Sequence, residues 1–272
     1  MGKVISIANQ KGGVGKTTTA INLSASLAAA EKRCLLIDCD PQGNATTGIG
    51  LDRSALKGGL YDLLLSRDSI GDLIHQTQLA SLDLIGATAP LIGAEVEIIQ
   101  LEDKEFRLRS RLGEMKRQYD YIFMDCPPSL GFLTVNALTA SDSVLVPLQC
   151  EYYALEGLSQ LLNTIRAVRR GLNPALYLEG ILLTMFDSRN NLSQQVTEEV
   201  RAHFKQRVYD TTIPRNVRLS EAPSHGKPVL LYDIQCKGAQ SYLALAREFM
   251  ERGRRKNGKE ESAWKGSLGS HS

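Results

Sequence analysis

Six short apolar runs recur along the chain, separated by longer amphipathic or polar stretches. The runs do not alternate strictly between apolar and polar residues, so each predicts a strand that is buried on both faces. Such strands, alternating with helices, indicate right-handed βαβ crossovers and an α/β fold: a doubly wound, mostly parallel sheet with helices on both faces. A ligand is then expected at the carboxyl ends of the strands. The predicted strands are Val4–Ala8, Cys34–Ile37, Leu82–Ile85, Tyr121–Met124, Val144–Leu148 and Gly180–Thr184.

The clearest helical pattern spans residues 154–170, where apolar side chains recur on one stripe and arginines lie elsewhere. Gly171 and Pro174 end this predicted helix. Because no repeat or linker divides the chain, we expect residues 1–252 to form a single domain. Residues 253–272 lack apolar periodicity and are rich in glycine, serine and charge, so they predict a disordered basic and polar tail. We interpret its last dozen residues as an extension left by cloning.

Composition fits a globular protein, with 43% hydrophobic and 23% charged residues among 272, and excludes disordered or fibrous classes. No apolar run is as long as a membrane span, and the N-terminus leads directly into a strand. We therefore expect neither a membrane segment nor a signal peptide. The five cysteines show no metal-binding spacing, which favours reduced, buried thiols in a cytoplasmic protein.

Charge is distributed unevenly along a chain whose net charge is only +2. Residues 160–259 contain 17 Lys and Arg but nine Asp and Glu. A basic C-terminal portion on a near-neutral protein suggests a polyanionic partner that touches one face. On charge alone, solvated helix surfaces explain the excess equally well.

The segment Asn9–Thr18 follows the first predicted strand and leads into a predicted helix. Its glycines allow backbone conformations that side chains forbid, so successive N–H groups can point towards a phosphate. The helix N-terminus adds free N–H groups and the positive end of the helix dipole. This pattern predicts a nucleoside triphosphate site in which Lys16 reaches the β- and γ-phosphates and Thr17 ligates Mg²⁺. The residues expected to contact ATP here are Lys11, Gly12, Gly13, Val14, Gly15, Lys16, Thr17 and Thr18.

Two acidic segments follow later predicted strands. Asp38 and Asp40 stand in the sequence Asp-Cys-Asp-Pro-Gln, and Asp125 follows four apolar residues in a Walker B pattern. A carboxylate at the end of a buried strand beside a phosphate loop can orient a water molecule or hold Mg²⁺ through its hydration shell. Taken alone, Asp38 and Asp40 would be strand-end caps. Beside this loop, we expect Thr17, Asp40 and Asp125 to hold the metal.

The loop differs from an ordinary P-loop at one informative place. Gln10 stands where the first glycine is expected, and a second lysine, Lys11, precedes the glycine pair. This is the deviant Walker A form, and with the acidic segments it resembles the ParA/MinD superfamily of P-loop ATPases. Longer segments make the chain similar to ParA/Soj-type chromosome or plasmid partition ATPases in particular, over residues 1–250. These segments are 137–142, 149–157 and 213–223.

Similarity to these ATPases implies a switch between monomer and homodimer. Two subunits would enclose two ATP molecules, and Lys11 of each would reach the phosphates bound by the other. The catalytic residues implied are Lys11, Lys16 and Asp40, with Asp40 positioning the attacking water in a slow reaction, while Asp38 supports the loop. The ATP-bound dimer would bind double-stranded DNA of the nucleoid without sequence preference, and a ParB-type protein would stimulate hydrolysis and release it.

The same resemblance implies roles for residues near the C-terminus. Arg189 and Arg218 match arginines that grip DNA phosphates, a contact that gives salt-dependent affinity without sequence preference. The alternative for each arginine is a surface salt bridge. Pro214 and Asn216 are expected to lie against the adenine, and Arg215 nearer to the nucleotide than to DNA.

Three other functions are weighed against this one. A MinD-like ATPase would cycle on membranes through a terminal amphipathic helix, but residues 241–250 are typical of a core-packing helix, so we expect no membrane partner. An iron-protein-like electron-transfer ATPase needs two cysteines per subunit for a shared [4Fe–4S] cluster, and only Cys126 stands near the expected region. A scaffold that binds ATP with hardly any hydrolysis is the third alternative, and Asp40 argues against it.

Overall fold

A seven-stranded sheet forms the centre of the molecule, for which a computed structural model describes residues 2–65, 69–151 and 154–268. The strand order is β3-β4-β2-β5-β1-β6-β7, and every neighbouring pair is parallel except β3 and β4. The predicted doubly wound, mostly parallel sheet is confirmed. The strands are β1 (Lys3–Ile7), β2 (Cys34–Asp38), β3 (His75–Gln76), β4 (Leu82–Ile85), β5 (Tyr121–Asp125), β6 (Ser143–Gln149) and β7 (Tyr177–Thr184).

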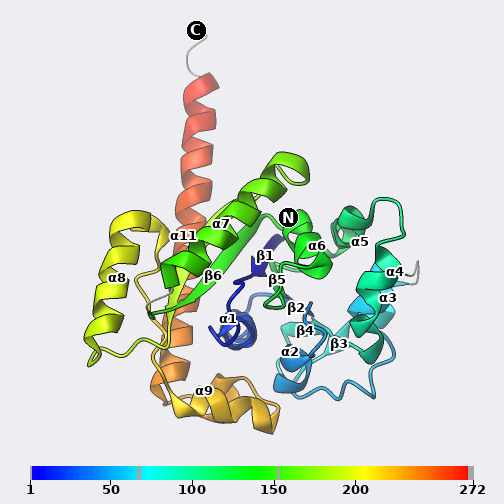
Figure 1. Ribbon diagram of the computed structural model, residues 1–272, viewed down its shortest axis with the longest axis horizontal. Coiled ribbons are helices and arrows are strands. Elements are labelled where there is room, and N and C mark those ends of the chain that lie inside the picture. The colour runs from blue at the N-terminus through cyan, green and yellow to red at the C-terminus, as the bar shows by residue number, and fades with distance from the viewer. Residues whose placement is uncertain (1, 66–68, 152–153, 269–272) are drawn as a thin grey trace.

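Helices cover both faces of this sheet (Figure 1). One face carries α1 (Lys16–Ala29), α2 (Asn44–Gly48), α9 (Val217–Glu221), α10 (Val229–Tyr232) and α11 (Lys237–Leu268). The other carries α3 (Leu60–Leu65), α4 (Ala94–Ile98), α5 (Arg107–Met115), α6 (Phe132–Ala140), α7 (Ala154–Gly171) and α8 (Asn191–Phe204). Short 3₁₀ helices lie at Ile70–Leu73, Ala89–Ile92, Lys104–Phe106, Lys205–Arg207 and Ala222–His225.

Each strand contributes side chains to two apolar cores because successive residues point to opposite faces of the sheet. On β1, Val4 packs into the core under α5, α6 and α7, whereas Ile5 and Ile7 pack into the core under α1 and α11. All three side chains are fully buried. The continuous apolar runs of the sequence therefore follow from burial on both faces.

β1 lies between β5 and β6. The strands on its two sides are reached by connections that run in opposite directions across the sheet. Crossovers from β1 to β2 and from β5 to β6 leave on opposite sides of this point, so a crevice opens beyond the carboxyl end of β1. The loop between β1 and α1 fills that crevice. This topology places the glycine-rich segment where a ligand is expected.

The edge strand β7 is covered by the segment 208–213 rather than left open. Tyr209 N donates to Ile181 O at 2.9 Å, and Ile213 N donates to Leu183 O at 2.9 Å. Further along, Phe186 N donates to Ile213 O at 3.0 Å. The loops that follow β7 and precede α9 therefore lie side by side.

The last helix differs from the sequence-based expectation of a disordered tail. α11 continues as helix to Leu268, past residue 253 where we expected regular structure to end. Lys, Arg, Glu and Ala have high helix propensities, and they extend a helix whose earlier turns are held by packing. Residues 269–272 of the expected tail lie outside the described residues.

Candidate functional site

The loop between β1 and α1 has the backbone geometry of a phosphate cradle. Gly13 and Gly15 have φ of +73° and +87°, values that favour glycine, and Gly15 directly precedes α1. Asn9 Nδ2 donates to Pro147 O at 2.8 Å, and Thr184 Oγ1 donates to Val14 O at 2.8 Å. The loop is thus fixed from β6 and β7. Thr184 is a contact that the sequence analysis missed, because 170 residues separate it from Val14.

The two lysines of this loop have different surroundings. Lys16 is buried, and its Nζ donates to Lys11 O at 2.9 Å. Burial lowers the pKa of Lys16, and the nearby Asp125 acts in the opposite direction. Lys11 is half exposed, and its Nζ lies 2.6 Å from Glu151 Oε2. Glu151, which also accepts a hydrogen bond from Gln149, had no role in the sequence analysis, since no local pattern links it to Lys11.

Asp125 ends β5 with a carboxylate that is buried and whose two oxygens have no hydrogen-bond partner among the described residues. Burial raises its pKa well above the ordinary value, and the charge of Asp38, its register partner on β2, adds to this shift. The side chains of Thr17 and Lys16 act in the opposite direction, so both are near this carboxylate. A buried carboxylate with so few polar neighbours is costly to ionise, and a further cation beside it would lower that cost.

Mg²⁺ fits this carboxylate as a partner. The site offers a hydroxyl at Thr17 and carboxylates at Asp125 and Asp40, which are the hard oxygen ligands that this ion prefers. Across the described ranges, no group of three or more His, Cys, Asp or Glu is arranged as a closed metal cage. Mg²⁺ typically keeps several waters and binds with substrate phosphates, so a closed protein cage is not required.

Asp38 and Asp40 make different contacts at the end of β2. Asp38 Oδ2 accepts hydrogen bonds from Thr46 N at 2.8 Å and Thr46 Oγ1 at 2.6 Å, and Asp38 Oδ1 accepts one from Asp40 N at 3.2 Å. Burial raises the pKa of Asp38 to about 6, although these hydrogen bonds oppose the shift. Asp40 uses one oxygen to accept from Gln42 N at 2.9 Å. Asp38 therefore supports the loop, while Asp40 retains an oxygen for other partners.

A pocket of about 230 Å³ joins the phosphate loop to the segment before α9. Gly15 and Thr18 line one side, and Pro214 and Asn216 line the other, together with Arg215. Asn216 Oδ1 caps α9 by accepting from Arg218 N at 3.0 Å, which leaves its Nδ2 group to donate elsewhere. Met185 and Tyr242 also line this pocket and were not foreseen. The residues expected to meet adenine thus lie together with the phosphate loop.

The remaining loop residues are placed as follows. Val14 is buried, whereas a Cβ added at Gly12 would meet no atom within 4 Å. Thr17 and Thr18 lie in the first turn of α1. Thr18 O accepts a hydrogen bond from Asn22 Nδ2 at 2.8 Å.

Arg189 and Arg218 lie outside this pocket, on exposed surface near it. Arg189 binds Asp187 through two guanidinium nitrogens, at 3.0 and 2.9 Å, and lowers the pKa of that carboxyl to about 2. Arg218 lies 2.8 Å from Glu221 and 3.4 Å from Asp233. Both arginines therefore have intramolecular acidic partners, the alternative that we considered for each.

Within the part of the chain that the structure describes, we find no helix that combines the length and the apolar character needed to cross a membrane.

Comparison with known proteins agrees with these features. A family model described as an AAA domain matches residues 2–178. The chromosome partitioning protein ParA of Myxococcus xanthus is 61% identical over 252 residues, which cover 93% of this chain and 89% of that protein. The sporulation initiation inhibitor protein Soj of Bacillus subtilis is 58% identical over 253 residues, which cover 93% of this chain and 100% of that protein.

A solved structure shares the fold at lower identity. Cobyrinic acid a,c-diamide synthase from Mycobacterium smegmatis, with a bound ATP analogue and magnesium, has a TM-score of 0.82 and 35% identity. The match covers 93% of this chain and 96% of that one. Because identity to the partition proteins is much higher over the same share of the sequence, the chain belongs to the ParA/Soj family of chromosome-partitioning ATPases.

Proposed function

We propose that this chain is a Mg²⁺-dependent partition ATPase whose ATP-bound homodimer binds DNA without sequence preference. The observation that carries this proposal is the meeting of three elements at one end of the sheet. They are the glycine loop with its two lysines, the unpartnered carboxylate of Asp125, and the pocket at Pro214 and Asn216. The last of these is lined by apolar and amide groups that suit a nucleobase.

The phosphate end of the site has a simple division of roles. Backbone N–H groups at Gly13–Lys16 and the N-terminus of α1 bind phosphate oxygens, and Lys16 exchanges its contact with Lys11 O for a phosphate. Bound Mg²⁺ supplies charge neutralisation at the β- and γ-phosphates. Thr17, Asp40 and Asp125 would hold this ion. Ionised Asp125 then gains the cation that its buried position otherwise lacks.

Hydrolysis is assigned to Asp40. One of its oxygens is held by Gln42 N, so the carboxylate has a fixed orientation and a second oxygen available to position water. Asp38 keeps this segment in place through Thr46. Positioning and electrostatic stabilisation are the main contributions that a protein makes to phosphoryl transfer.

Lys11 serves the homodimer. In the single chain its ammonium pairs with Glu151 of the same subunit, and exposed pairs of this kind contribute about 1 kcal/mol or less. Phosphates bound by a second subunit carry more negative charge than one carboxylate. We infer that ATP draws Lys11 across the interface, and that a ParB-type protein later accelerates hydrolysis and returns the monomer.

The DNA surface of the dimer includes Arg189 and Arg218. Their present partners, Asp187 and Glu221, hold each guanidinium at the surface. A dimer doubles the number of such contacts, and this multivalency makes DNA affinity depend on ATP.

Duplex binding across a salt series, without nucleotide, with ADP and with ATP, tests this function. We expect tight binding only with ATP, weakening steeply as salt rises. Arg189→Glu with Arg218→Glu should abolish that binding and leave ATP-dependent dimerisation intact. Absence of DNA binding in every nucleotide state would refute the proposal, and loss of dimerisation in the double variant would refute the roles of these arginines.

The electron-transfer alternative has little support from the position of Cys126. Its side chain is buried, with Sγ 3.8 Å from Met124 O. A cluster shared between subunits needs ligands at the surface. A colourless purified protein without iron would exclude this alternative.

A further inference from the structure

The end of the sheet opposite the glycine loop carries two adjoining open hollows. Their volumes are about 740 and 430 Å³, and Gly2, Lys116 and Asp120 line both. The larger hollow lies at the amino ends of the strands, where Tyr121 begins β5 and Tyr177 begins β7. Thr184 in the nucleotide pocket lies seven residues after Tyr177 along β7, a span of about 23 Å at 3.3 Å per residue. The hollows are therefore distinct from the nucleotide site.

The charged residues that line the two hollows are seven Lys or Arg and only two Asp. Two acidic groups in this region are paired with lysines, and a third, Asp120, accepts a hydrogen bond from a backbone N–H. Asp142 lies 2.9 Å from Lys116 Nζ, and Asp120 Oδ2 accepts from Arg33 N at 2.8 Å. The buried Glu179 lies 2.7 Å from Lys3 Nζ. No further acid in the lining neutralises the remaining cations.

Four of the lining cations, Lys32, Arg33, Arg117 and Arg254, make no ion pair or side-chain hydrogen bond within the described ranges 2–65, 69–151 and 154–268. We call these four residues the basic pole. Three of them are exposed and Lys32 is half-buried. Near the proposed DNA and dimer surfaces, Lys11, Arg189 and Arg218 have acidic partners, whereas Arg215, which lines the nucleotide pocket, makes no side-chain ion pair within the described ranges. The pole is therefore one surface on which unpaired positive charge gathers, and such a surface attracts anions.

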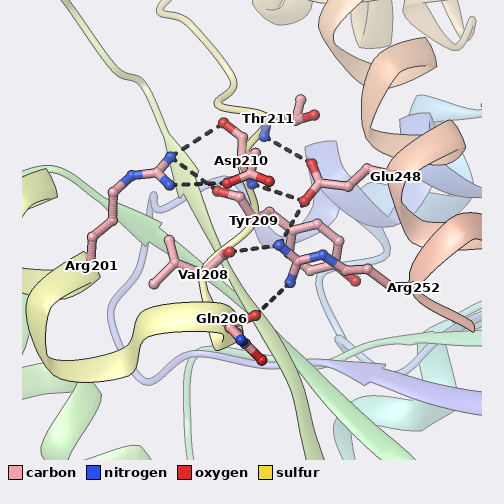
Figure 2. A network of polar contacts seen from close by, with 8 residues as sticks. All are labelled: Arg201, Gln206, Val208, Tyr209, Asp210, Thr211, Glu248 and Arg252. Atoms are coloured by element: carbon pink, nitrogen blue, oxygen red, sulfur yellow. Dashed lines mark hydrogen bonds and ion pairs between the residues drawn. The ribbon is translucent and has the colours of Figure 1, made fainter. Parts of the chain in front are cut away.

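A network of polar contacts holds α11 beside this region (Figure 2). Arg252 donates to Gln206 O at 3.0 Å and to Val208 O at 2.7 Å. Glu248 accepts from Asp210 N at 2.8 Å and Thr211 N at 2.9 Å. Arg254, two residues after Arg252, lines the larger hollow, and Figure 1 shows α11 projecting from the body on the side where the N-terminus lies, away from α9.

We propose that the basic pole is a second contact surface for the phosphate backbone of duplex DNA. Its cations come from three separate places: the end of the α1–β2 turn, the segment after α5, and α11. Groups spread in this way over open surface suit an extended polyanion, whereas a compact anion requires convergent groups. Phosphate contacts of this kind are independent of base sequence.

The position of the basic pole, opposite the nucleotide site, has a consequence for the dimer, which rests on the proposed function. If two subunits meet through the carboxyl ends of their strands, where the nucleotides lie, the two poles point away from each other. One dimer then carries DNA-binding surfaces at its two ends as well as near its centre. It can hold two duplexes together.

Charge reversal tests the pole. The variant Lys32→Glu with Arg33→Glu and Arg117→Glu is compared with wild type for binding of a 30-bp duplex across a salt series, with and without ATP. We expect binding at low salt at least fivefold weaker in both conditions. We also expect the slope of log K against log [salt] to decrease by up to about 2.7, the value for three lost phosphate contacts. Basal ATP hydrolysis and ATP-dependent dimerisation should not change, because these residues lie far from the nucleotide.

A charge-conserving variant is the matched control. Lys32→Arg with Arg33→Lys and Arg117→Lys should keep wild-type affinity and slope, because phosphate contacts need charge and little else. Bridging is measured by capture of a labelled duplex on beads that carry a second duplex. Wild type with ATP should capture it, while the charge-reversal variant should bind the beads without capturing the label.

The outcomes separate the two proposals. Wild-type protein that binds no DNA in any state would refute the proposed function. Wild type that binds with ATP, and a charge-reversal variant with the same affinity and slope, would overturn the basic pole alone. A polyglutamate peptide tests for an acidic protein partner. If this peptide competes with DNA on the wild-type protein, and the charge-reversal variant loses affinity for the peptide but keeps its affinity for DNA, the pole binds an acidic protein. The DNA assignment would then be wrong.

Discussion

The phosphate loop contains two lysines, Lys11 and Lys16, which differ in burial and in their hydrogen-bond partners. The proposed function gives them different roles. Lys16 is buried and held by a carbonyl of its own loop, so it is already positioned for phosphate. Lys11 is half exposed and held by Glu151. Under the proposed function, Lys11 leaves the contacts of its own subunit to reach a second one. A weak partner suits that movement, and an ion pair this exposed is weak.

Replacing Glu151 should therefore favour the dimer. In Glu151→Gln, Lys11 loses a competing carboxylate, and we expect ATP-dependent dimerisation to strengthen by about two- to fivefold, the equivalent of an exposed ion pair. Sedimentation velocity with ATP and Mg²⁺ measures this. Lys11→Ala serves as the control and should form no dimer with ATP. A Glu151→Gln protein that dimerises as wild type does, or more weakly, would contradict the competition.

Asp38 gives a prediction about pH. Its pKa rises from 3.8 to about 6 on folding, so the folded protein keeps a proton that the unfolded chain has lost between these values. The free energy of unfolding must then fall as pH rises from about 4 to about 6. Asp38→Asn removes this titration and should flatten that part of the profile. Urea unfolding of both proteins between pH 4 and 7 measures it, and equal slopes would show that Asp38 does not titrate there.

Among the secondary-structure elements, the central strands were the most predictable. Their apolar runs are long enough to be buried on both faces, and the expected positions agree with β1, β2 and β4–β7 to within about three residues. The helix expected at 154–170 is α7, Ala154–Gly171. The glycine loop, the acidic strand ends and their order along the chain predicted a site at the carboxyl edge of the sheet, and the structure brings these residues together at that edge.

Other features had no local signal. β3 has two residues, His75 and Gln76, and no apolar run, because it only pairs at the sheet edge. The contact of Lys11 with Glu151 joins residues 140 positions apart, and the presence of Arg254 in the hollow that Lys3 also lines depends on the packing of α11. Such contacts follow from topology and from side-chain packing, which the spacing of residues along the chain does not encode.

The network of Figure 2 links α11 to the segment after α8 and gives a prediction for that element. Glu248→Ala removes the acceptor for two backbone N–H groups, so we expect a loss of about 1–3 kcal/mol in the free energy of unfolding. Amide hydrogens of Asp210 and Thr211 should exchange faster. Guanidinium unfolding and hydrogen exchange measure these effects. Glu199→Ala, at an exposed position on α8, is the control, and equal protection in both variants would contradict this role for Glu248.

For the whole molecule, Gly12 provides a probe of assembly. A Cβ at this position meets nothing within 4 Å inside the subunit, so Gly12→Val should fold normally and still bind ATP. In a dimer that encloses ATP at this loop, the added side chain lies at the interface. We therefore expect a monomer in the presence of ATP, measured by light scattering after size exclusion, with nucleotide binding as the control. Normal dimerisation would show that Gly12 does not face the second subunit.

The covering of β7 affects how the protein behaves at high concentration. An open, eight-residue edge strand would present unpaired N–H and C=O groups to the same edge of another copy and favour aggregation. Here the segment 208–213 occupies that edge, and Glu248 and Arg252 fasten the segment to α11. Sheet extension is thereby blocked at this edge, so a high concentration of the protein need not lead to fibres. Under the proposed function, reversible association then falls to the surfaces that ATP and DNA would engage.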